Sequence, residues 1–391
     1  MPQASVLLDP SLTGAAALTL AHSLDNLIIG QPEARAQIVS AYQTYLAGLN
    51  PPNRPVANFL FLGPTGTGKT RTVEALAESL VGTSRAVLKI DCAEFQHSQE
   101  IAKLIGSPPG YLGHRETLPL LSQDNLNQYR NSHGAPMSFV LFDEIEKASD
   151  ALWNLLLGIL DKATLTLGDN RRVDFSRTMI FLTSNLGARE MESMITPRLG
   201  FSAASECDAT PAPDPERLAR SATEAARRRF TPEFMNRLDK VVVFRTLDEA
   251  AIRRILDLEL SFVQRRILAS DGTASFVFTL SEAAKEKLIR LGTGAKYGAR
   301  HLKRAIDREL VQPLANLMAT GQARQGDWIH IDIGDETQSE HLRFRREREC
   351  MAPQAMADVY GFNPVASLAQ VTEAAFAKEK VMEQAASRSR R

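Results

Sequence analysis

Two short stretches of the chain combine residue types that suit phosphate chemistry. The first reads GPTGTGKT over residues 63–70 and matches the pattern G-x-x-x-x-G-K-[ST] directly after an apolar run. Glycines let backbone N–H groups turn toward phosphate oxygens, and the N-terminus of a following helix adds partial positive charge. Lys69 would reach the β- and γ-phosphates, and the Thr70 hydroxyl would ligate Mg²⁺. The stretch predicts a nucleotide-binding loop made of Gly63, Pro64, Thr65, Gly66, Thr67, Gly68, Lys69 and Thr70.

The second stretch, FVLFDEIEKA over residues 139–148, ends an apolar run with two carboxylates. Asp143 and Glu144 would lie at the C-terminal end of a buried strand, which is the edge where open α/β sheets bind ligands. Asp143 can hold the Mg²⁺ shell, and Glu144 can orient or deprotonate a water that attacks the γ-phosphate. An acidic pair can also simply cap a strand, but the phosphate-binding loop upstream favours the catalytic interpretation.

A third apolar run ends in a polar side chain that suits the same chemistry. The run FLTSN places Asn185 directly after residues 181–184. Asn185 could hydrogen-bond the attacking water or the γ-phosphate, and an ordinary turn asparagine is an equally good interpretation on local grounds.

The spacing of apolar residues indicates which elements position these side chains. Continuous apolar runs are typical of strands buried on both faces of a parallel sheet. Between the first two runs, Val73, Leu76 and Leu80 form one stripe of an amphipathic helix. The pattern predicts an α/β domain whose parallel sheet is flanked by helices. Its expected strands cover residues 57–62, 86–90, 138–142, 178–183 and 240–244.

The pattern changes after residue 246. A long helix over 247–269 and short strands over 275–280, 328–333 and 341–345 indicate a smaller α+β domain. Residues 203–217 are rich in Ala, Pro and Asp, which predicts a flexible loop. The predicted organisation is an N-terminal arm over 1–18, a large nucleotide-binding domain over 19–246, a small domain over 247–346 and a polar tail over 347–391.

Composition limits the possible partners. The 391 residues include 46 basic and 46 acidic side chains, so the net charge gives no case for nucleic acid or a membrane surface. The three cysteines are far apart and fit neither a disulfide framework nor a zinc site. No apolar run approaches the ~18 residues that a membrane span needs. The N-terminus lacks a signal-peptide pattern, and we therefore expect a cytoplasmic protein.

Taken together, the motifs resemble the AAA+ ATPases of the Clp/heat-shock unfoldase family, and specifically the C-terminal ATPase module of ClpA, ClpB and ClpC proteins. The resemblance implies a P-loop AAA+ sheet followed by a Clp-type lid domain, with ATP and Mg²⁺ at the site. It also implies a homohexamer that threads protein substrates through a central pore as an unfoldase or chaperone. The similar stretches are NRPVANFLFLGPTGTGKT (53–70), GSPPGYLG (106–113), FVLFDEIEKA (139–148), RRVDFSRTMIFLTSNLGA (171–188), TPEFMNRLDKVVVF (231–244) and KYGARHLKRAID (296–307).

The resemblance also implies roles for single residues. Ile28 and Ile29 match the segment that packs against adenine, and Asn185 matches the sensor-1 position. Arg300 matches the sensor-2 arginine, which contacts nucleotide from the small domain. Arg237 matches the arginine finger that each subunit supplies to a neighbour's site. The expected catalytic set is therefore Glu144, Asn185, Arg237 and Arg300.

Two further segments are similar to family loops that contact proteins. Tyr111 matches the aromatic residue that grips a translocating polypeptide, and a ring can contact many kinds of side chain. The implied pore loop is Gly110, Tyr111, Leu112 and Gly113. A second loop resembles the tripeptide that docks to a ClpP-type peptidase, and it consists of Leu199, Gly200 and Phe201.

One departure from the family pattern keeps other functions open. The sequence contains one ATPase module, so disaggregation by the larger family members does not transfer directly. The alternative is a ring ATPase that remodels nucleic acid or a specific protein complex without threading. Arginines over 343–348 favour nucleic acid, but such runs are more often solvated, and we expect no nucleic-acid partner. A nucleotide-switched scaffold without turnover is a third possibility, against which the complete set of hydrolytic residues argues.

Overall fold

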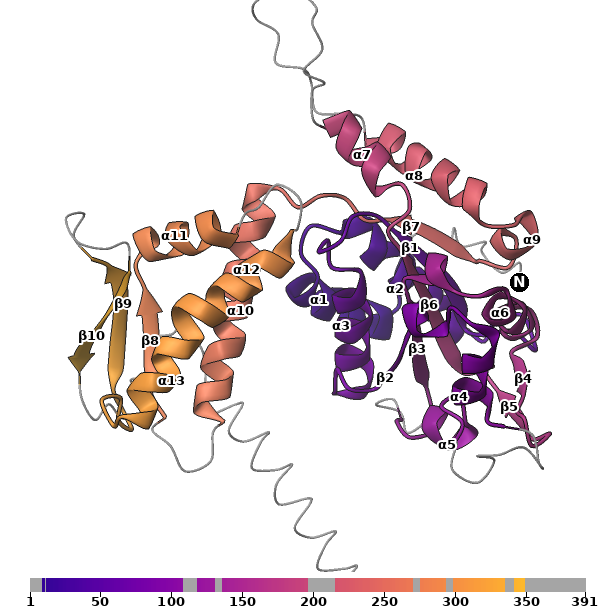
Figure 1. Cartoon of the computed structure of the whole chain (residues 1–391), viewed down its shortest axis with the longest axis horizontal. Helices are drawn as coiled ribbons and strands as arrows, with labels where there is room; N and C mark the ends of the chain where they lie inside the picture. Colours follow the sequence, from indigo (N-terminus) through magenta and orange to yellow (C-terminus); the bar gives the residue numbers. More distant parts are fainter. Residues whose placement is uncertain are drawn as a thin grey trace, which may run out of the picture. The chain divides into compact units, whose positions relative to one another are not determined.

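The computed structural model describes residues 9–10, 12–107, 118–130, 136–195, 215–269, 275–292, 298–334 and 341–348 (Figure 1). The chain divides into two compact units, Met1–Ala251 and Ile252–Arg391. Each unit has its own hydrophobic core, and each is described by itself below. The finer predicted division, with an arm over 1–18 and a tail over 347–391, stays a prediction.

A five-stranded parallel sheet forms the centre of the first unit. Its strand order is β2-β3-β6-β1-β7. Every neighbouring pair is parallel, as expected for strands that are connected through helices. The strands are β1 (Ala57–Leu62), β2 (Val87–Asp91), β3 (Ser138–Asp143), β6 (Thr178–Ser184) and β7 (Lys240–Val243).

Both faces of this sheet are buried. Alternate residues of one strand belong to different clusters: Leu60 and Leu62 to one, Phe59 and Phe61 to the other. This period of two is what a strand requires when helices cover both of its faces. The result confirms the predicted α/β class, with strand bounds within one residue of those expected from the apolar runs.

Helices of the first unit cover both faces of the sheet. The first cluster includes residues of α6 and α8, and the second includes residues of α1, α2 and α3, so the two groups cover opposite faces. The helices are α1 (Ala15–Leu27), α2 (Pro32–Leu46), α3 (Lys69–Val81), α6 (Asp150–Lys162), α7 (Ala188–Ile195), α8 (Pro215–Arg229) and α9 (Pro232–Met235). Shorter turns are α4 (Ala102–Ile105), α5 (Gln123–Leu126), η1 (Cys92–Phe95), η2 (Ser98–Ile101) and η3 (Ile145–Lys147).

Two local features differ from the sequence predictions. The loop expected over 203–217 is too long, because α8 begins at Pro215, and proline is well tolerated in the first turn of a helix. A hairpin of β4 (Thr164–Thr166) and β5 (Arg172–Asp174) was not predicted. Its three-residue strands are too short to give a periodic signal.

The second unit is a smaller α+β structure, in agreement with the sequence. Its sheet has the order β10-β9-β8, with β8 and β9 parallel and β9 and β10 antiparallel. Helices lie on one side of the sheet (Figure 1), and a separate apolar cluster fills the space between them. The elements are α10 (Glu249–Leu268), β8 (Val277–Leu280), α11 (Glu282–Gly292), α12 (Ala299–Ile306), η4 (Asp307–Val311), α13 (Gln312–Ala319), β9 (Trp328–Ile333) and β10 (Leu342–Arg348).

No helix within the described ranges combines the length and the apolar character that crossing a membrane requires.

Candidate functional site

The glycine-rich loop between β1 and α3 has a backbone that only glycine accommodates without strain. Gly63 has φ +135°, and a Cβ added there would lie 2.4 Å from the carbonyl oxygen of Phe244. Gly68, the N-cap of α3, has φ +100°. These left-handed conformations bring backbone N–H groups and the N-terminus of α3 to one side of the loop. Gly63 and Gly68 therefore adopt the kind of backbone conformation that the predicted phosphate-binding loop requires.

Lys69 is held inside this loop. Its Nζ donates to the carbonyl oxygens of Gly63 (2.6 Å) and Pro64 (2.9 Å) and to Oδ1 of Asn185 (3.0 Å). Only 8% of the residue is exposed. A buried ammonium is costly unless it is hydrogen-bonded, so these three acceptors stabilise the lysine at the loop. Lys69 and Asn185, 116 residues apart in sequence, are thus direct neighbours.

Gln31 fastens the loop to the end of β7. Its Nε2 donates to the carbonyl oxygens of Thr67 (3.2 Å) and Arg245 (2.9 Å), and its Oε1 accepts from the backbone N–H of Arg245 (3.1 Å). The neighbouring Ile28 is buried in the cluster around α1 and α2, and Ile29 is half-buried. The contact of these two residues with adenine stays a prediction.

The hydroxyl of Thr70 and the carboxylate of Asp143 meet at the C-terminal edge of the sheet. Oγ1 of Thr70 lies 3.5 Å from Oδ2 of Asp143, and the other oxygen of Asp143 accepts a short hydrogen bond from Thr183. Hydroxyl and carboxylate oxygens are ligands that Mg²⁺ prefers, and Mg²⁺ usually completes its shell with phosphate and water oxygens. The donor set therefore fits this ion.

Glu144 adopts an unusual backbone conformation beside Asp143. Its φ is +55°, which costs on the order of 1 kcal/mol for a residue with a side chain and is common at functional sites. Its backbone N–H donates to Oγ1 of Thr183 (3.1 Å), and its carboxylate accepts from Nδ2 of Asn185 (3.4 Å). An ion pair with Lys147 completes its contacts, and the hydrogen bond to Glu144 raises the pKa of the Lys147 amine.

Asn185 is held from its backbone as well as its side chain. Oε1 of Glu146 accepts from the backbone N–H of Asn185 (3.2 Å), and the carbonyl oxygen of Glu146 accepts from Nη2 of Arg229 (3.2 Å). Sequence reasoning missed Glu146 and assigned no role to Thr183. Their only signal was their position within the matched stretches, one or two residues from predicted site residues.

Cys92 lies beneath these carboxylates. It follows β2, whose last residue Asp91 pairs in register with Asp143. Burial of the thiol raises its pKa, and the nearby charges of Asp143, Asp91, Glu146 and Glu144 raise it further. The thiol therefore stays protonated and unreactive in the folded protein.

The two predicted arginines belong to other segments of the chain. Arg237 precedes β7 and is bonded to Asn58 near the start of β1, whereas the glycine-rich loop follows the end of β1. Five residues of strand, about 17 Å at ~3.3 Å each, separate Asn58 from Gly63. Arg300 is exposed on α12 of the second unit.

The two predicted protein-contacting loops, 110–113 and 199–201, lie outside the described residues.

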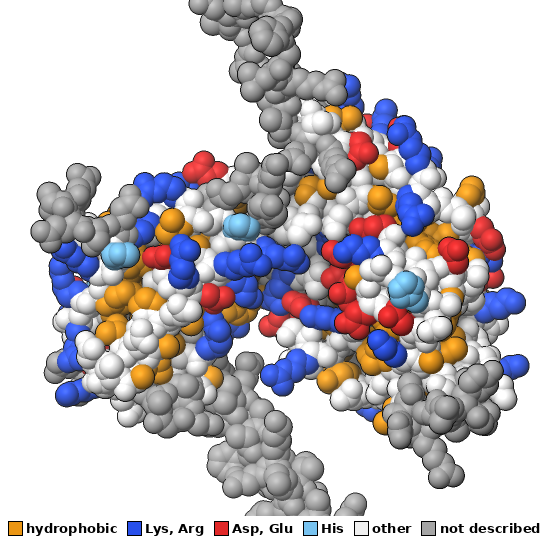
Figure 2. Space-filling view, in the orientation of Figure 1, with side chains coloured by type: hydrophobic (Ala, Val, Ile, Leu, Met, Phe, Trp, Pro, Cys, Tyr) orange, Lys and Arg blue, Asp and Glu red, His pale blue; other side chains and the backbone are white. Residues whose placement is uncertain are grey.

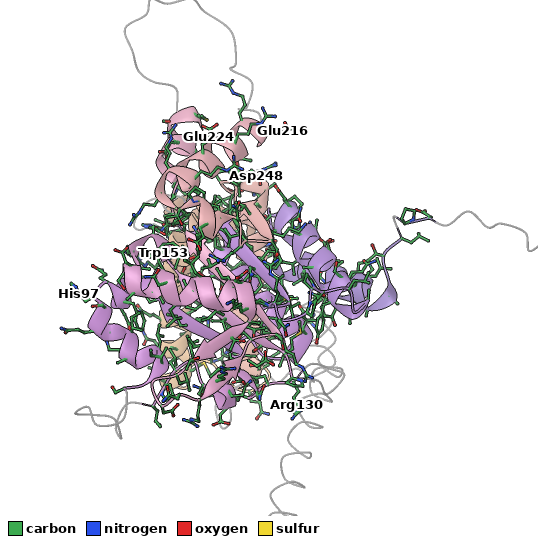
Figure 3. All side chains as sticks on the ribbon, turned by 90° about the vertical axis from the view of Figure 1, so that its right-hand side faces the viewer. His97, Arg130, Trp153, Glu216, Glu224 and Asp248 are labelled. Atoms are coloured by element: carbon green, nitrogen blue, oxygen red, sulfur yellow. The ribbon has the colours of Figure 1, made fainter. Side chains whose placement is uncertain are left out.

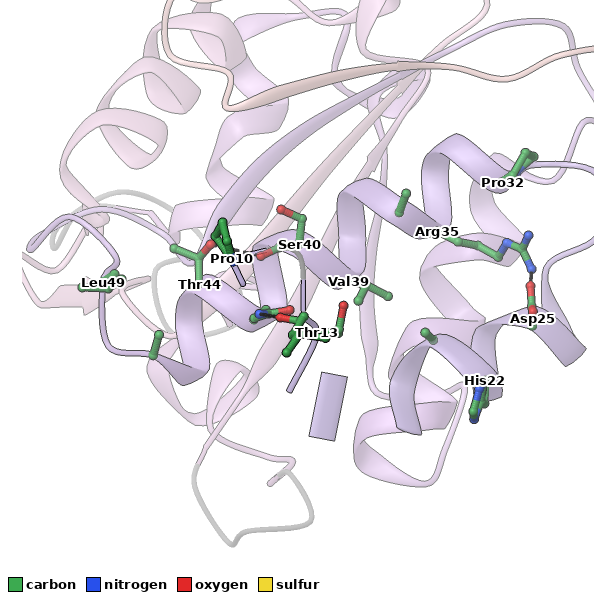
Figure 4. A pocket seen from close by; sticks show the side chains of 15 residues that line it. Pro10, Thr13, His22, Asp25, Pro32, Arg35, Val39, Ser40, Thr44 and Leu49 are labelled. Carbon is green, nitrogen blue, oxygen red and sulfur yellow. Dashed lines mark hydrogen bonds and ion pairs between the residues drawn. The ribbon is translucent and has the colours of Figure 1, made fainter. Parts of the chain in front are cut away.

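A groove of about 690 Å³ on the surface of α1 and α2 contains none of the predicted site residues (Figure 4). Arg35 and Asp25 form an ion pair in its wall.

The fold and the site together define a P-loop nucleotide-binding domain with a Walker-type carboxylate pair. Comparison with known families is more specific. Residues 54–241 match the AAA domain (Cdc48 subfamily), and residues 247–331 match the C-terminal, D2-small domain of ClpB protein. The chain therefore carries an AAA+ ATPase module of the Clp family, in the arrangement found at the C-terminal end of ClpB and ClpC proteins.

Individual relatives agree with this assignment. The chain is 36% identical over 322 residues to chaperone protein ClpB 1 of Parasynechococcus marenigrum, covering 82% of this chain and 34% of the relative. It is 37% identical over 315 residues to the ATP-dependent Clp protease ATP-binding subunit ClpC of Staphylococcus saprophyticus, covering 81% and 36%. The chain thus spans about a third of the length of these relatives.

A solved structure supports the same fold. The S. cerevisiae Hsp104–casein complex in its extended conformation superposes with a TM-score of 0.69 at 28% identity, covering 84% of this chain and 52% of that one.

Proposed function

We propose that this chain hydrolyses ATP within a ring and uses the energy to unfold protein substrates. The observation that carries the proposal is that the side chain of Asn185 contacts both Lys69 and Glu144, while Thr183 holds the carboxylate of the adjacent Asp143. The assignment to AAA ATPases supports hydrolysis as the reaction. Domains over 19–246 and 247–346 would then be the large and small parts of one ATPase module.

The residues divide the hydrolysis between them. Backbone N–H groups of the loop and the ammonium of Lys69 bind phosphate oxygens, for which Lys69 exchanges its present carbonyl partners. Thr70 and Asp143 would hold Mg²⁺, which neutralises charge on the phosphates when it is bound. Glu144 orients a water and accepts its proton, and Asn185 holds the Glu144 carboxylate in place.

Arg237 would complete the site of a neighbouring subunit. The length of β1 separates its backbone from the loop of its own chain, which supports a role for its guanidinium at a site in trans. An arginine finger stabilises the charge that develops on the transferred phosphoryl group and is worth ~10³–10⁵ in rate. A finger in trans requires a ring, and the family favours a homohexamer. Arg300 would report nucleotide state from the small domain, as the sensor-2 resemblance implies.

A protein substrate is favoured over nucleic acid. The solved relative of S. cerevisiae was bound to casein, which supports protein as the class of substrate. The β10 arginines have protein partners: Arg346 pairs with Asp327 at 3.1 Å, and Arg348 lies over the ring of Trp328. Threading past Tyr111 remains a proposal from sequence, as do a cytoplasmic location and ClpP docking through residues 199–201.

The test separates hydrolysis from mechanical work. Glu144→Gln should bind ATP and turn it over at least ~10²-fold more slowly, because the base is lost. Tyr111→Ala should keep basal ATPase activity but lose unfolding of a tagged fluorescent protein, whereas Tyr111→Phe should keep both. Rapid turnover by Glu144→Gln would contradict the hydrolysis assignment. Unfolding by Tyr111→Ala would favour the alternative, in which the ring remodels a complex without threading.

A further inference from the structure

The backbone of Arg237 is fixed by a buried side chain from the central sheet. Nδ2 of Asn58, in β1, donates to the carbonyl oxygen of Arg237 (3.1 Å) and to that of Leu160 (3.0 Å). Asn58 is completely buried. Most other residues of this strand are large and apolar. Burying a polar side chain among them costs free energy unless that side chain is hydrogen-bonded.

Both carbonyl groups lie at or just beyond the C-terminal end of a helix. Leu160 lies in the last turn of α6, where carbonyl oxygens have no partner within the helix. Arg237 follows the short helix α9, and Nη2 of Arg54 donates to the same oxygen (3.3 Å). A single buried amide therefore joins β1, the end of α6 and the turn that presents Arg237.

The surrounding contacts hold the turn from other directions. Asn58 and Asp239 exchange two hydrogen bonds, of 2.8 and 2.9 Å, and Arg54 pairs with Asp239 at 3.4 Å. On α9, the ring of Phe234 packs edge-on against Trp153 of α6 with centroids 4.6 Å apart. Figure 3 labels Trp153 on α6. The turn thus has little freedom to shift away from β1.

The guanidinium of Arg237 is oriented by two carboxylates. Nη1 lies 2.8 Å from Glu233, and Nη2 lies 3.7 Å from Asp161, the residue after Leu160. About a quarter of the side chain remains exposed. The arginine is directed by acceptors on α6 and α9 while part of it faces solvent.

The same strands lead directly to the nucleotide site. β1 connects Asn58 to Gly63, the residue after its end, and β7 connects the Arg237 turn to Phe244 and Arg245, which follow it. At that end the loop touches β7 through Gly63 and Phe244, and Gln31 bonds both sides. We infer that Asn58 is a positioning residue for Arg237, and that the β1–β7 pair couples the nucleotide site of one subunit to the finger that it supplies to the next.

The inference rests on the proposed function, in which Arg237 acts in trans. It extends that proposal because it names a residue that touches neither nucleotide nor substrate. Misplacing a catalytic group by about 1 Å can cost ~10²-fold in rate, so loss of the Asn58 amide should slow hydrolysis without weakening ATP binding.

The first experiment is a double-mutant cycle on steady-state ATPase rates. Asn58→Ala should lower kcat at least ~10-fold with KM for ATP nearly unchanged, and Asn58→Ala/Arg237→Ala should be no slower than Arg237→Ala. Asn58→Ser, which keeps one donor, should be intermediate. Arg54→Ala, at a partly exposed position, provides a second variant that removes the other donor to the same carbonyl. If the kcat of the double variant falls by the product of the two single losses, the two residues act independently and the inference is overturned.

Rings that contain two kinds of subunit distinguish a failure of this inference from a failure of the proposed arginine finger in trans. Glu144→Gln subunits cannot hydrolyse ATP but still present Arg237. When they are added in excess, most neighbours of a test subunit supply an intact Arg237. The ATPase rate per Asn58→Ala subunit and per Arg237→Ala subunit should therefore rise, whereas the rate per Lys69→Ala subunit should not. If only Arg237→Ala is rescued, Asn58 supports its own site and the inference is wrong. If Arg237→Ala is not rescued, the finger in trans is wrong, and the inference falls with it.

Discussion

Oδ1 of Asn185 accepts a hydrogen bond of 3.0 Å from Nζ of Lys69, across 116 residues of sequence. The amide nitrogen of the same side chain lies 3.4 Å from the Glu144 carboxylate. One side chain therefore contacts both the lysine that we propose binds phosphate and the proposed general base. In the proposed mechanism, a change at the phosphates can reach the group that activates water through this side chain.

Asn185→Ala should lower kcat about 10²-fold, the usual cost of losing one positioned polar group at a reacting centre. Nucleotide affinity should change little, because Lys69 keeps its two carbonyl acceptors in the free protein. Steady-state ATPase rates and fluorescent-nucleotide binding measure the two effects. Asn127→Ala, at the exposed C-terminus of α5, is the matched control and should behave as wild type. A normal kcat for Asn185→Ala would remove Asn185 from the catalytic set.

Glu146→Ala should also slow hydrolysis, by about 10-fold, because the backbone N–H of Asn185 loses its acceptor. Glu146→Gln keeps an oxygen at the same position and should retain most of the activity. The comparison of these two variants separates the hydrogen bond from the negative charge. Equal losses in both would show that the charge matters and that the bond to Asn185 does not.

Gly63→Ala should abolish ATP binding and lower the melting temperature. The added Cβ meets the Phe244 carbonyl at 2.4 Å in a backbone conformation that alanine avoids. Gly82→Ala is the matched control, because Gly82 has φ +82° at the end of α3 but open space around it. This substitution should lower the free energy of unfolding by about 1–2 kcal/mol, which is the cost of the left-handed conformation for alanine, and the variant should still bind ATP. Thermal unfolding with and without nucleotide checks both variants.

Cys92 should resist thiol reagents in the folded protein, because burial and neighbouring carboxylates raise its pKa. In a Cys207→Ser/Cys350→Ser background, modification at pH 8 should wait for unfolding. Since the folded pKa is raised, the contribution of this thiol to stability is complete below the unfolded pKa of ~8.5 and is lost as pH rises above it. At pH 9.5 the loss should be on the order of 1 kcal/mol.

Denaturant unfolding of the same background with and without Cys92→Ala measures this loss. The variant without the thiol should show a correspondingly flatter decline in stability between pH 8 and 9.5. Fast labelling of the folded protein, or equal pH dependence in the two proteins, would contradict the burial of Cys92.

The helix α8 shows a limit of prediction from the spacing of apolar residues. Leu218, Ala222 and Ala226 are buried against the sheet, and the arginines on the remainder of the helix are exposed, where Figure 2 shows basic side chains. This helix was not predicted, and its start at Pro215 lies within the Ala- and Pro-rich stretch. The five strands of the large sheet were predicted more closely, because a buried strand leaves a continuous apolar run that no loop imitates.

Local sequence determined the chemistry of this protein: a glycine-rich loop with Lys69 and Thr70, followed by a carboxylate pair at the end of an apolar strand. Backbone conformation and residue type are properties of a few consecutive residues, so they can be recognised from the printed order alone. Tertiary structure decided which distant side chains complete the site. Asn185 reaches Lys69, Thr183 aligns Asp143 with Glu144, and Asn58 holds Arg237, because the order β2-β3-β6-β1-β7 brings together strand ends that are far apart along the chain.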